Sequence, residues 1–142
     1  MDGDFASLHG RWAGEEDVYA TAWTPAGRAT AELVFAHGPG GTLLIDYAEH
    51  RADGDMTGHG VVSDGGWWWF DSYGFVPASA GTSAWEDGEL ILERRSERGR
   101  NVMVLSSDGD RLTMRLAAAP VDGELQQLVA GVYRRVTAAP SA

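Results

Sequence analysis

A histidine and an aspartate flank a run of tryptophans in the stretch GHGVVSDGGWWWFDSYG, residues 58–74. Side chains alternate between the two faces of a β-strand, so Trp69 and Asp71 share one face. A three-residue Asp-Gly-Gly loop, a common hairpin length that favours glycine, would place His59 opposite Asp71. A two-residue Gly-Gly turn would place His59 opposite Ser72 instead. The first register brings an imidazole and a carboxylate together beside an indole ring.

A His–Asp pair of this kind can serve three purposes. It can be a structural hydrogen bond that seals one end of the fold, or the polar anchor of an apolar, aromatic ligand site. In both cases the carboxylate holds the imidazole in one tautomer. The histidine can also act as a general base, although the sequence supplies no accompanying nucleophile or second acid. We therefore expect no catalytic residues, and the structural and ligand-binding interpretations both stay open.

Turn signals and alternation indicate the elements that carry these residues. Asp-Gly pairs tolerate the positive φ of tight hairpins, and they divide much of the chain into short segments. The segment RLTMRLAA places Leu112 and Met114 on one face and arginines on the other, which is typical of a half-buried antiparallel strand. The predicted strands cover residues 11–23, 28–36, 42–50, 56–63, 67–72, 80–86, 89–96, 100–106, 111–118 and 126–136.

About ten sequential strands joined mostly by tight turns predict an all-β protein. We expect an antiparallel up-and-down barrel, because closure leaves no exposed sheet edge. A barrel of about eight to ten strands is wide enough to hold a small ligand, and a filled β-sandwich is the alternative. Residues 1–136 are predicted to form a single barrel domain, with at most a short helix over residues 4–9. Residues 137–142 are predicted to be a disordered tail.

Composition and charge limit the partners. The formal net charge is −10, and all eleven basic residues are arginine. Such a charge repels phosphate backbones and anionic lipid, so we expect no nucleic-acid and no membrane partner. There are no cysteines, which excludes disulfides and thiolate metal sites. We find no signal-peptide pattern and no apolar run as long as a membrane span, so we expect a cytoplasmic protein.

The two ends of the chain carry a further pattern, with GRW at residues 10–12 and YRR at residues 133–135. Together with the stretches LHGRWAGEED, GHGVVSD, WFDSYG and GVYRR, this pattern resembles the lipocalin and calycin superfamily. In particular it resembles a bacterial calycin-like family of uncharacterised proteins that look related to nitrobindin-type barrels. The resemblance covers roughly residues 5–136.

This resemblance implies a ten-stranded barrel with an internal cavity. Trp12 would close one end, covered by Arg134 or Arg135 of the last strand in a cation–π contact. Nitrobindin-like haem proteins ligate iron through a histidine near the C-terminal strand, whereas this sequence has no histidine after His59. We therefore expect no haem and no other cofactor.

The main hypothesis is a barrel that binds a small apolar or amphipathic molecule in its cavity. Methionines would supply adaptable apolar contacts, and Tyr47 joins the face of His59 only if the loop at residues 51–55 has odd length. One alternative is an enzyme on the same barrel, either a haem-dependent nitrogen-oxide enzyme or a small isomerase that uses His59. Another is an interaction protein with a filled barrel. The predicted ligand-binding residues are Tyr47, His59, Trp69, Asp71, Trp85, Met103 and Met114.

Two further expectations concern the outer face and metals. Trp68 and Phe70 should form an apolar patch on the outer face, which is a candidate homodimer interface. Trp67, next to the turn, should be only partly buried at a barrel mouth. We expect no metal site, because Glu49 and His50 are adjacent and face opposite sides of a strand.

Overall fold

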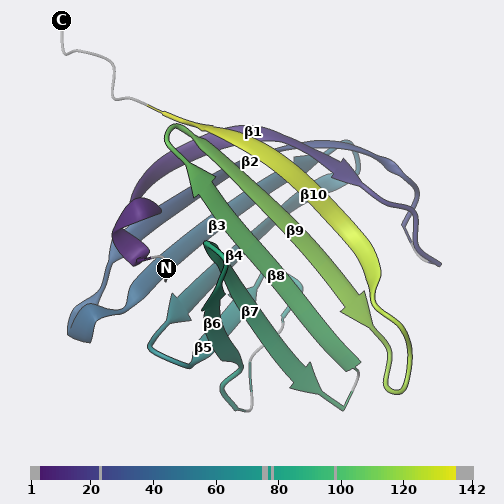
Figure 1. Cartoon of the computed structure of the whole chain (residues 1–142). Coiled ribbons are helices and arrows are strands. Elements are labelled where there is room, and N and C mark those ends of the chain that lie inside the picture. Colours follow the sequence, from purple (N-terminus) through teal and green to yellow (C-terminus); the bar gives the residue numbers. More distant parts are fainter. Residues whose placement is uncertain (1–3, 23, 75–76, 78, 98, 137–142) are drawn as a thin grey trace, which may run out of the picture.

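The computed structural model describes residues 4–22, 24–74, 77, 79–97 and 99–136. Ten antiparallel strands follow one another along the chain and curve into a nearly closed barrel (Figure 1). The predicted all-β, up-and-down barrel is therefore confirmed. Two short 3₁₀ turns, η1 (Phe5–Ser7) and η2 (Pro39–Gly41), accompany the strands. The strands are β1 (Gly10–Val18), β2 (Gly27–His37), β3 (Leu43–Arg51), β4 (Gly54–Val62), β5 (Trp67–Asp71), β6 (Thr82–Glu86), β7 (Glu89–Ser96), β8 (Gly99–Asp108), β9 (Arg111–Ala119) and β10 (Gln126–Arg135).

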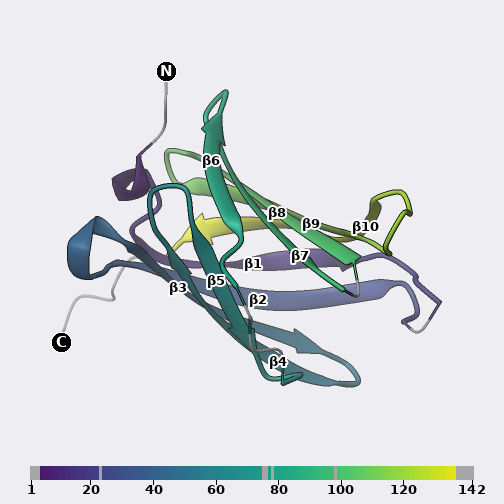
Figure 2. The ribbon, with the colours of Figure 1, turned by 90° about the horizontal axis from the view of Figure 1, so that it is seen from below.

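The sheet runs in the order β5-β4-β3-β2-β1-β10-β9-β8-β7-β6. The pairing of β1 with β10 places the first strand beside the last. The edge strands β5 and β6 lie next to each other in Figure 2. An isolated bridge joins Trp67 of β5 to Gly81, the residue before β6. The Ser83 hydroxyl also donates to the Ser63 carbonyl oxygen at 2.8 Å. The barrel is thus nearly, rather than fully, closed.

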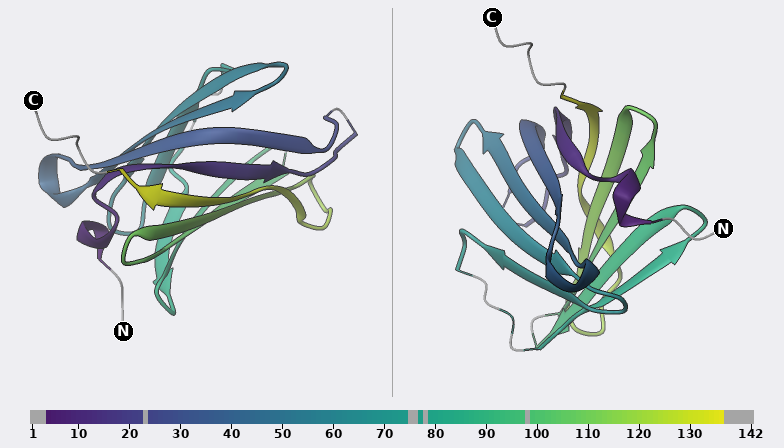
Figure 3. Two further views of the ribbon diagram at one scale, coloured as in Figure 1. Left: turned by 90° about the horizontal axis from the view of Figure 1, so that it is seen from above. Right: turned by 90° about the vertical axis from the view of Figure 1, so that its left-hand side faces the viewer.

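The N-terminal segment closes one end of the barrel, and Figure 3 shows η1 beside the strand ends there. Leu8 and Trp12 are fully buried, and Trp12 Nε1 donates to the Leu8 carbonyl oxygen at 2.9 Å. The Arg135 guanidinium lies 4.2 Å from the centroid of the Trp12 ring and donates to the His9 carbonyl oxygen at 2.6 Å. The predicted cation–π contact between the first and last strands is confirmed, with Arg135 as the partner.

Apolar side chains fill the half of the barrel nearest η1, which we call the closed half. They come from every part of the sheet because alternate residues of each strand face the interior. Burying one such side chain stabilises the fold by roughly 1.5–3 kcal/mol, so this half supplies much of the hydrophobic driving force. Its fully buried members include Leu8, Trp12, Leu33, Phe35, Leu43, Ile45, Leu90, Leu92, Leu105 and Leu112.

The tryptophan run is divided by the pleat of β5, as expected. Trp69 faces inward, whereas Trp68 and Phe70 face outward and are 36% and 40% exposed. The prediction for Trp67 is wrong, because this side chain is only 2% exposed. It lies at the junction of β5 and β6, where Trp69 packs against it with ring centroids 6.1 Å apart.

Some predictions fall at or beyond the limits of the described residues. The strand predicted over residues 11–23 ends at Val18, and Trp23 lies outside the described residues. The predicted disordered tail, residues 137–142, lies outside them as well. The described part of the chain contains no helix of the length and apolarity that crossing a membrane requires.

Candidate functional site

The predicted pair of His59 with Asp71 is wrong. Gly58, not His59, lies opposite Asp71 in the ladder between β4 and β5, because the loop that joins these strands has four residues rather than three. His59 lies on the outer face, where its Nδ1 is 2.8 Å from Asp46 Oδ1 on β3. Both side chains are about half exposed or more, so the histidine belongs to a surface pair.

The register of β4 has a steric reason. Gly58 and Gly60 face the interior directly beneath the ring of Trp69. A Cβ at Gly58 would lie 2.1 Å from the Trp69 ring, so only glycine fits without a shift of the ring. A slip of one residue would move His59 into this space, because it turns every side chain of the strand to the other face.

Four of the predicted ligand-binding residues face the interior and are at least nine-tenths buried: Tyr47, Trp69, Met103 and Met114. Tyr47 pairs with Gly58 on β4 and therefore shares the inward face of Gly58 rather than the face of His59. Its ring centroid lies 6.4 Å from that of Trp69.

The remaining two predicted residues, Asp71 and Trp85, are less deeply buried. Asp71 is partly buried and accepts hydrogen bonds from Trp69 Nε1 at 3.3 Å and from the Tyr73 backbone N–H at 3.0 Å. Trp85 is partly buried near η1, with its ring centroid 6.3 Å from that of Phe5. The structure therefore brings Asp71 to Trp69 but places Trp85 toward the closed half.

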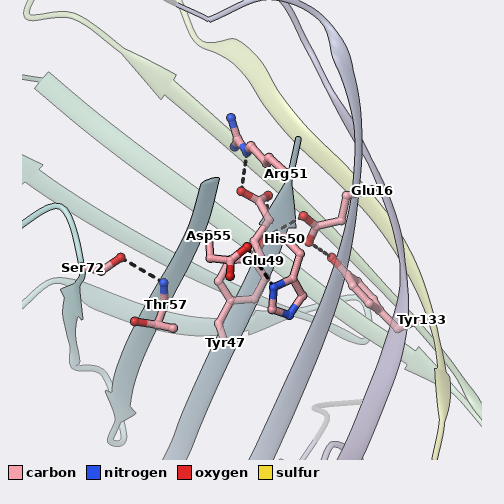
Figure 4. A network of polar contacts seen from close by, with 9 residues as sticks. All are labelled: Glu16, Tyr47, Glu49, His50, Arg51, Asp55, Thr57, Ser72 and Tyr133. Atoms are coloured by element: carbon pink, nitrogen blue, oxygen red, sulfur yellow. Dashed lines mark hydrogen bonds and ion pairs between the residues drawn. The ribbon is translucent and has the colours of Figure 1, made fainter. Parts of the chain in front are cut away.

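The other half of the barrel, which we call the open half, contains a network of buried polar side chains (Figure 4). We call it the carboxyl network; its members are Glu16 on β1, Tyr47, Glu49 and Arg51 on β3, and Tyr133 on β10. The Tyr47 hydroxyl lies 2.8 and 2.7 Å from the two Glu16 oxygens and 2.9 Å from Glu49 Oε2. The Tyr133 hydroxyl donates to Glu16 Oε2 at 2.5 Å. Arg51 Nε donates to Glu49 Oε1 at 2.5 Å.

Strand alternation and a glycine bring these groups together. Tyr47, Glu49 and Arg51 are two residues apart on β3, so all three point inward. Tyr133 leans over Gly131, where a Cβ would lie 2.0 Å from the tyrosine hydroxyl oxygen. The missing side chain at Gly131 thus leaves room for the ring.

Counting hydrogens places an extra proton in the carboxyl network. A tyrosine hydroxyl has one proton to donate, and Tyr133 directs its proton to Glu16. Tyr47 lies within hydrogen-bond distance of both carboxyl groups but can donate to only one of them. The other contact becomes a hydrogen bond when that carboxyl group is protonated and donates to the tyrosine oxygen. Two ionised carboxylates this close together would also repel each other strongly.

Glu16 is the carboxyl group that holds this proton. Burial raises its pKa, and the hydrogen bond with Glu49 raises it further, to about 8, against the opposing hydrogen bonds from Tyr133 and Tyr47. Burial also acts to raise the pKa of Glu49, but hydrogen bonds from Glu16 and Arg51 and the positive charge of Arg51 outweigh it, so the pKa of Glu49 is lowered. At neutral pH the network therefore combines a neutral Glu16 with an ion pair between Glu49 and Arg51.

A pocket of about 560 Å³, which we call the mouth pocket, opens beside Arg51. The loop after β1 forms one wall, and apolar side chains such as Val18, Ala118, Ala119 and Leu128 form others. The Arg51 side chain is 22% exposed, while Glu49 behind it is 0% exposed. Among the described residues that line the pocket, the guanidinium of Arg51 is the charged group, and it links the pocket to the buried network.

A second inward-facing guanidinium, Arg94 of β7, lies partly buried across the interior. It is 6.0 Å from the centroid of the Trp67 ring. Burial lowers the pKa of Arg94, while the negative charge of Asp71 opposes this effect. In the part of the chain that the structure describes, no three histidine, aspartate or glutamate side chains gather as a metal site would require.

Apart from Tyr47, the carboxyl network is not among the predicted site residues. A signal for it exists in the alternation of β1, where Trp12 and Glu16 share the inward face, so the strand that buries the tryptophan also buries the glutamate. Glu49 bears the same relation to Tyr47 on β3. Charged residues are rarely fully buried, so this general preference predicts that both glutamates are exposed.

Several solved structures share this fold. Rv2717c from M. tuberculosis has a TM-score of 0.68 at 22% sequence identity, over 93% of this chain and 94% of that protein. A protein of unknown function from the DUF3598 family of Nostoc punctiforme PCC 73102 has a TM-score of 0.65 at 13% identity, over 95% of this chain and 50% of that protein. The S-type phycobiliprotein lyase CPES from Guillardia theta has a TM-score of 0.65 at 9% identity, over 95% and 92% of the two chains.

Comparisons with models of protein families and with curated proteins gave no match. At these low identities the structural likeness shows the fold and nothing finer. The chain therefore forms a ten-stranded antiparallel near-barrel of the kind seen in these three proteins.

Proposed function

We propose that this protein binds a small apolar or amphipathic molecule in the open half of a calycin-like barrel. The mouth pocket is the observation that carries the proposal, because its apolar walls meet the buried carboxyl network at Arg51. Small-molecule sites combine a mostly apolar cavity with a few fixed polar groups. The likeness to a phycobiliprotein lyase is compatible with ligand binding in this fold.

The energetics of the carboxyl network support a role beyond stability. A buried ion pair is often no more stabilising than apolar side chains of similar volume, and apolar side chains fill the closed half of the same barrel. The network holds Arg51 through Glu49, and Glu49 in turn through Tyr47 and Glu16. Such a chain of contacts fixes the orientation of a polar group that a ligand can meet.

The predicted lining residues fit this site in part. Tyr47, Trp69 and Met103 face the interior and remain proposed ligand contacts deeper in the barrel, together with Asp71. His59 is not part of the proposal, because its side chain lies on the outer face.

Two adjacent alanines of β9 allow a matched test. Ala118 lines the mouth pocket, whereas Ala117 faces the other side of the strand. The probe is N-phenyl-1-naphthylamine, a neutral apolar fluorophore, titrated into the wild-type protein, Ala118→Trp and Ala117→Trp. Filling the pocket with an indole should weaken binding at least about tenfold in Ala118→Trp, which corresponds to about 1.4 kcal/mol.

The control variant decides the interpretation. Ala117→Trp adds the same side chain on the outer face and should leave the dissociation constant of the probe unchanged within about twofold. Equal weakening in both variants would contradict the location of the site. A wild-type protein that shows no saturable binding would contradict the proposed function and favour a filled barrel.

A further inference from the structure

We propose that the ligand of the mouth pocket carries a carboxylate or another anionic head group, which binds the guanidinium of Arg51. This inference rests on the proposed function and adds the chemical class of the ligand. The inference follows from the charged groups of the open half, because some of them are buried and one of them lines the pocket.

The carboxyl groups of the network are covered. Glu16 and Glu49 are both fully buried, and the hydroxyl of Tyr47 lies against both of them. Arg51 is the member of the carboxyl network that lines the pocket, and it lies beyond Glu49 at the end of the network in Figure 4. A ligand that enters the pocket therefore meets a cation and not the carboxyl groups.

The guanidinium retains donors for a ligand. Glu49 engages Arg51 through Nε at 2.5 Å, and among the described residues no hydrogen bond from the two terminal nitrogens is found. An arginine has five N–H donors in a planar fork that matches the two oxygens of a carboxylate. Because Glu49 already holds one edge of this fork, the rest is oriented in advance and loses little freedom when an anion binds.

The rest of the pocket defines the body of the ligand. Val18, Ala119 and Leu128 offer apolar surface, which suits a hydrocarbon or aromatic body rather than a sugar or an inorganic ion. The formal net charge of −10 opposes the approach of anions in general. An anion that binds well must therefore find a specific local partner, and Arg51 is placed to be that partner.

Two fluorophores that differ in one charged group test this inference. The anionic probe is 8-anilinonaphthalene-1-sulfonate, and its neutral counterpart is N-phenyl-1-naphthylamine. Arg51→Met alone leaves Glu49 buried without its cation and can impair folding, so the main variant is Glu49→Gln/Arg51→Met, which removes both charges and preserves the net charge. The control is Arg111→Met, which removes an exposed arginine at the far end of β9.

The double variant should bind the anionic probe at least about tenfold more weakly, the effect expected when a charge-assisted hydrogen bond is lost. It should bind the neutral probe within about twofold of the wild-type protein. Arg111→Met should leave both affinities within the same twofold range, and Ala118→Trp should weaken both probes, which places them in the mouth pocket.

The possible failures are distinguishable. Undiminished binding of the anionic probe to the double variant overturns the inference about the anion, as does an equal loss of both probes. Saturable binding of the neutral probe that Ala118→Trp weakens would in either case leave the proposed function intact. If neither probe binds the wild-type protein, the inference and the proposed function both fail.

Discussion

Both halves of the barrel interior contain fully buried side chains, but the chemistry of these side chains differs. In the closed half, Trp12, Leu105 and Leu112 are fully buried among apolar neighbours. In the open half, Glu16 and Glu49 are equally buried, yet they are surrounded by hydroxyl groups and a guanidinium. The comparison shows that side chains buried to the same degree can have different roles. Those of the closed half stabilise the fold, whereas those of the open half position polar groups next to a pocket.

The largest effect on stability should come from the closed half. Trp12→Ala should lower the free energy of unfolding by roughly 3–5 kcal/mol, because it leaves a large cavity and removes the partner of the Arg135 guanidinium. Urea unfolding followed by circular dichroism measures this change. Trp68→Ala on the outer face is the control and should cost less than about 1 kcal/mol. Similar losses in the two variants would contradict the assignment of Trp12 to the core.

The second effect concerns the ion pair of the open half. Arg51→Met should lower the free energy of unfolding by about 1–3 kcal/mol, because Glu49 is then buried without a cation; partial exposure of Arg51 reduces the effect below that of a fully buried pair. Glu49→Gln/Arg51→Met should recover at least about 1 kcal/mol of this loss, since no charge is left unpaired. A double variant less stable than the single one would show that the charges are not coupled as described.

The third effect is a dependence of stability on pH. The folded-state pKa of Glu16, about 8, lies above its ordinary value of 4.5, so the folded protein binds this proton more tightly than the unfolded chain does. The stabilisation is complete below about pH 4.5 and is lost as the pH rises through about 8, with a slope of at most about 1.4 kcal/mol per pH unit. Glu49, whose pKa is lowered, acts in the opposite sense in acid.

Glu16→Gln tests this assignment because the amide cannot titrate. Urea unfolding between about pH 5 and pH 8 should show stability falling with pH in the wild-type protein and a much flatter profile in Glu16→Gln. Parallel profiles for the two proteins would mean that Glu16 does not hold the proton.

The smallest effect should come from the outer face. His59→Ala removes a contact with Asp46 between two exposed side chains, and such pairs contribute between about 0 and 1 kcal/mol. The same unfolding measurement should show almost no change. A loss of stability as large as that of Arg51→Met would indicate that the His59 side chain faces the barrel interior.

The fold could be predicted further than the site because the two depend on different signals. Asp-Gly turns and period-two segments mark the strands, and an error of a residue at a strand end leaves the barrel intact. The site depends on register, and one extra residue in the loop between β4 and β5 turned His59 away from Asp71. Gly58 and Gly60 lie against the Trp69 ring, and they indicate the correct register only when the volume of that ring is considered.

The burial of Glu16 and Glu49 could not be predicted from the sequence for a different reason. Their positions follow from the alternation that places Trp12 and Tyr47 inward, whereas their charge favours an outer face. The contacts of Tyr47 and Tyr133 with Glu16 and of Arg51 with Glu49 show how the cost of burial is offset. The contacts with Glu16 join residues that are distant in sequence.

The comparison between the two halves is tested most directly by an amide ¹H–¹⁵N NMR titration with N-phenyl-1-naphthylamine. The account predicts that chemical-shift changes concentrate around the mouth pocket, at Val18, Arg51 and Leu128, while the amides of Trp12 and Leu105 in the closed half stay in place. Changes centred on the exposed side chains of β5, or an absence of changes at a concentration of probe that saturates its fluorescence signal, would contradict it.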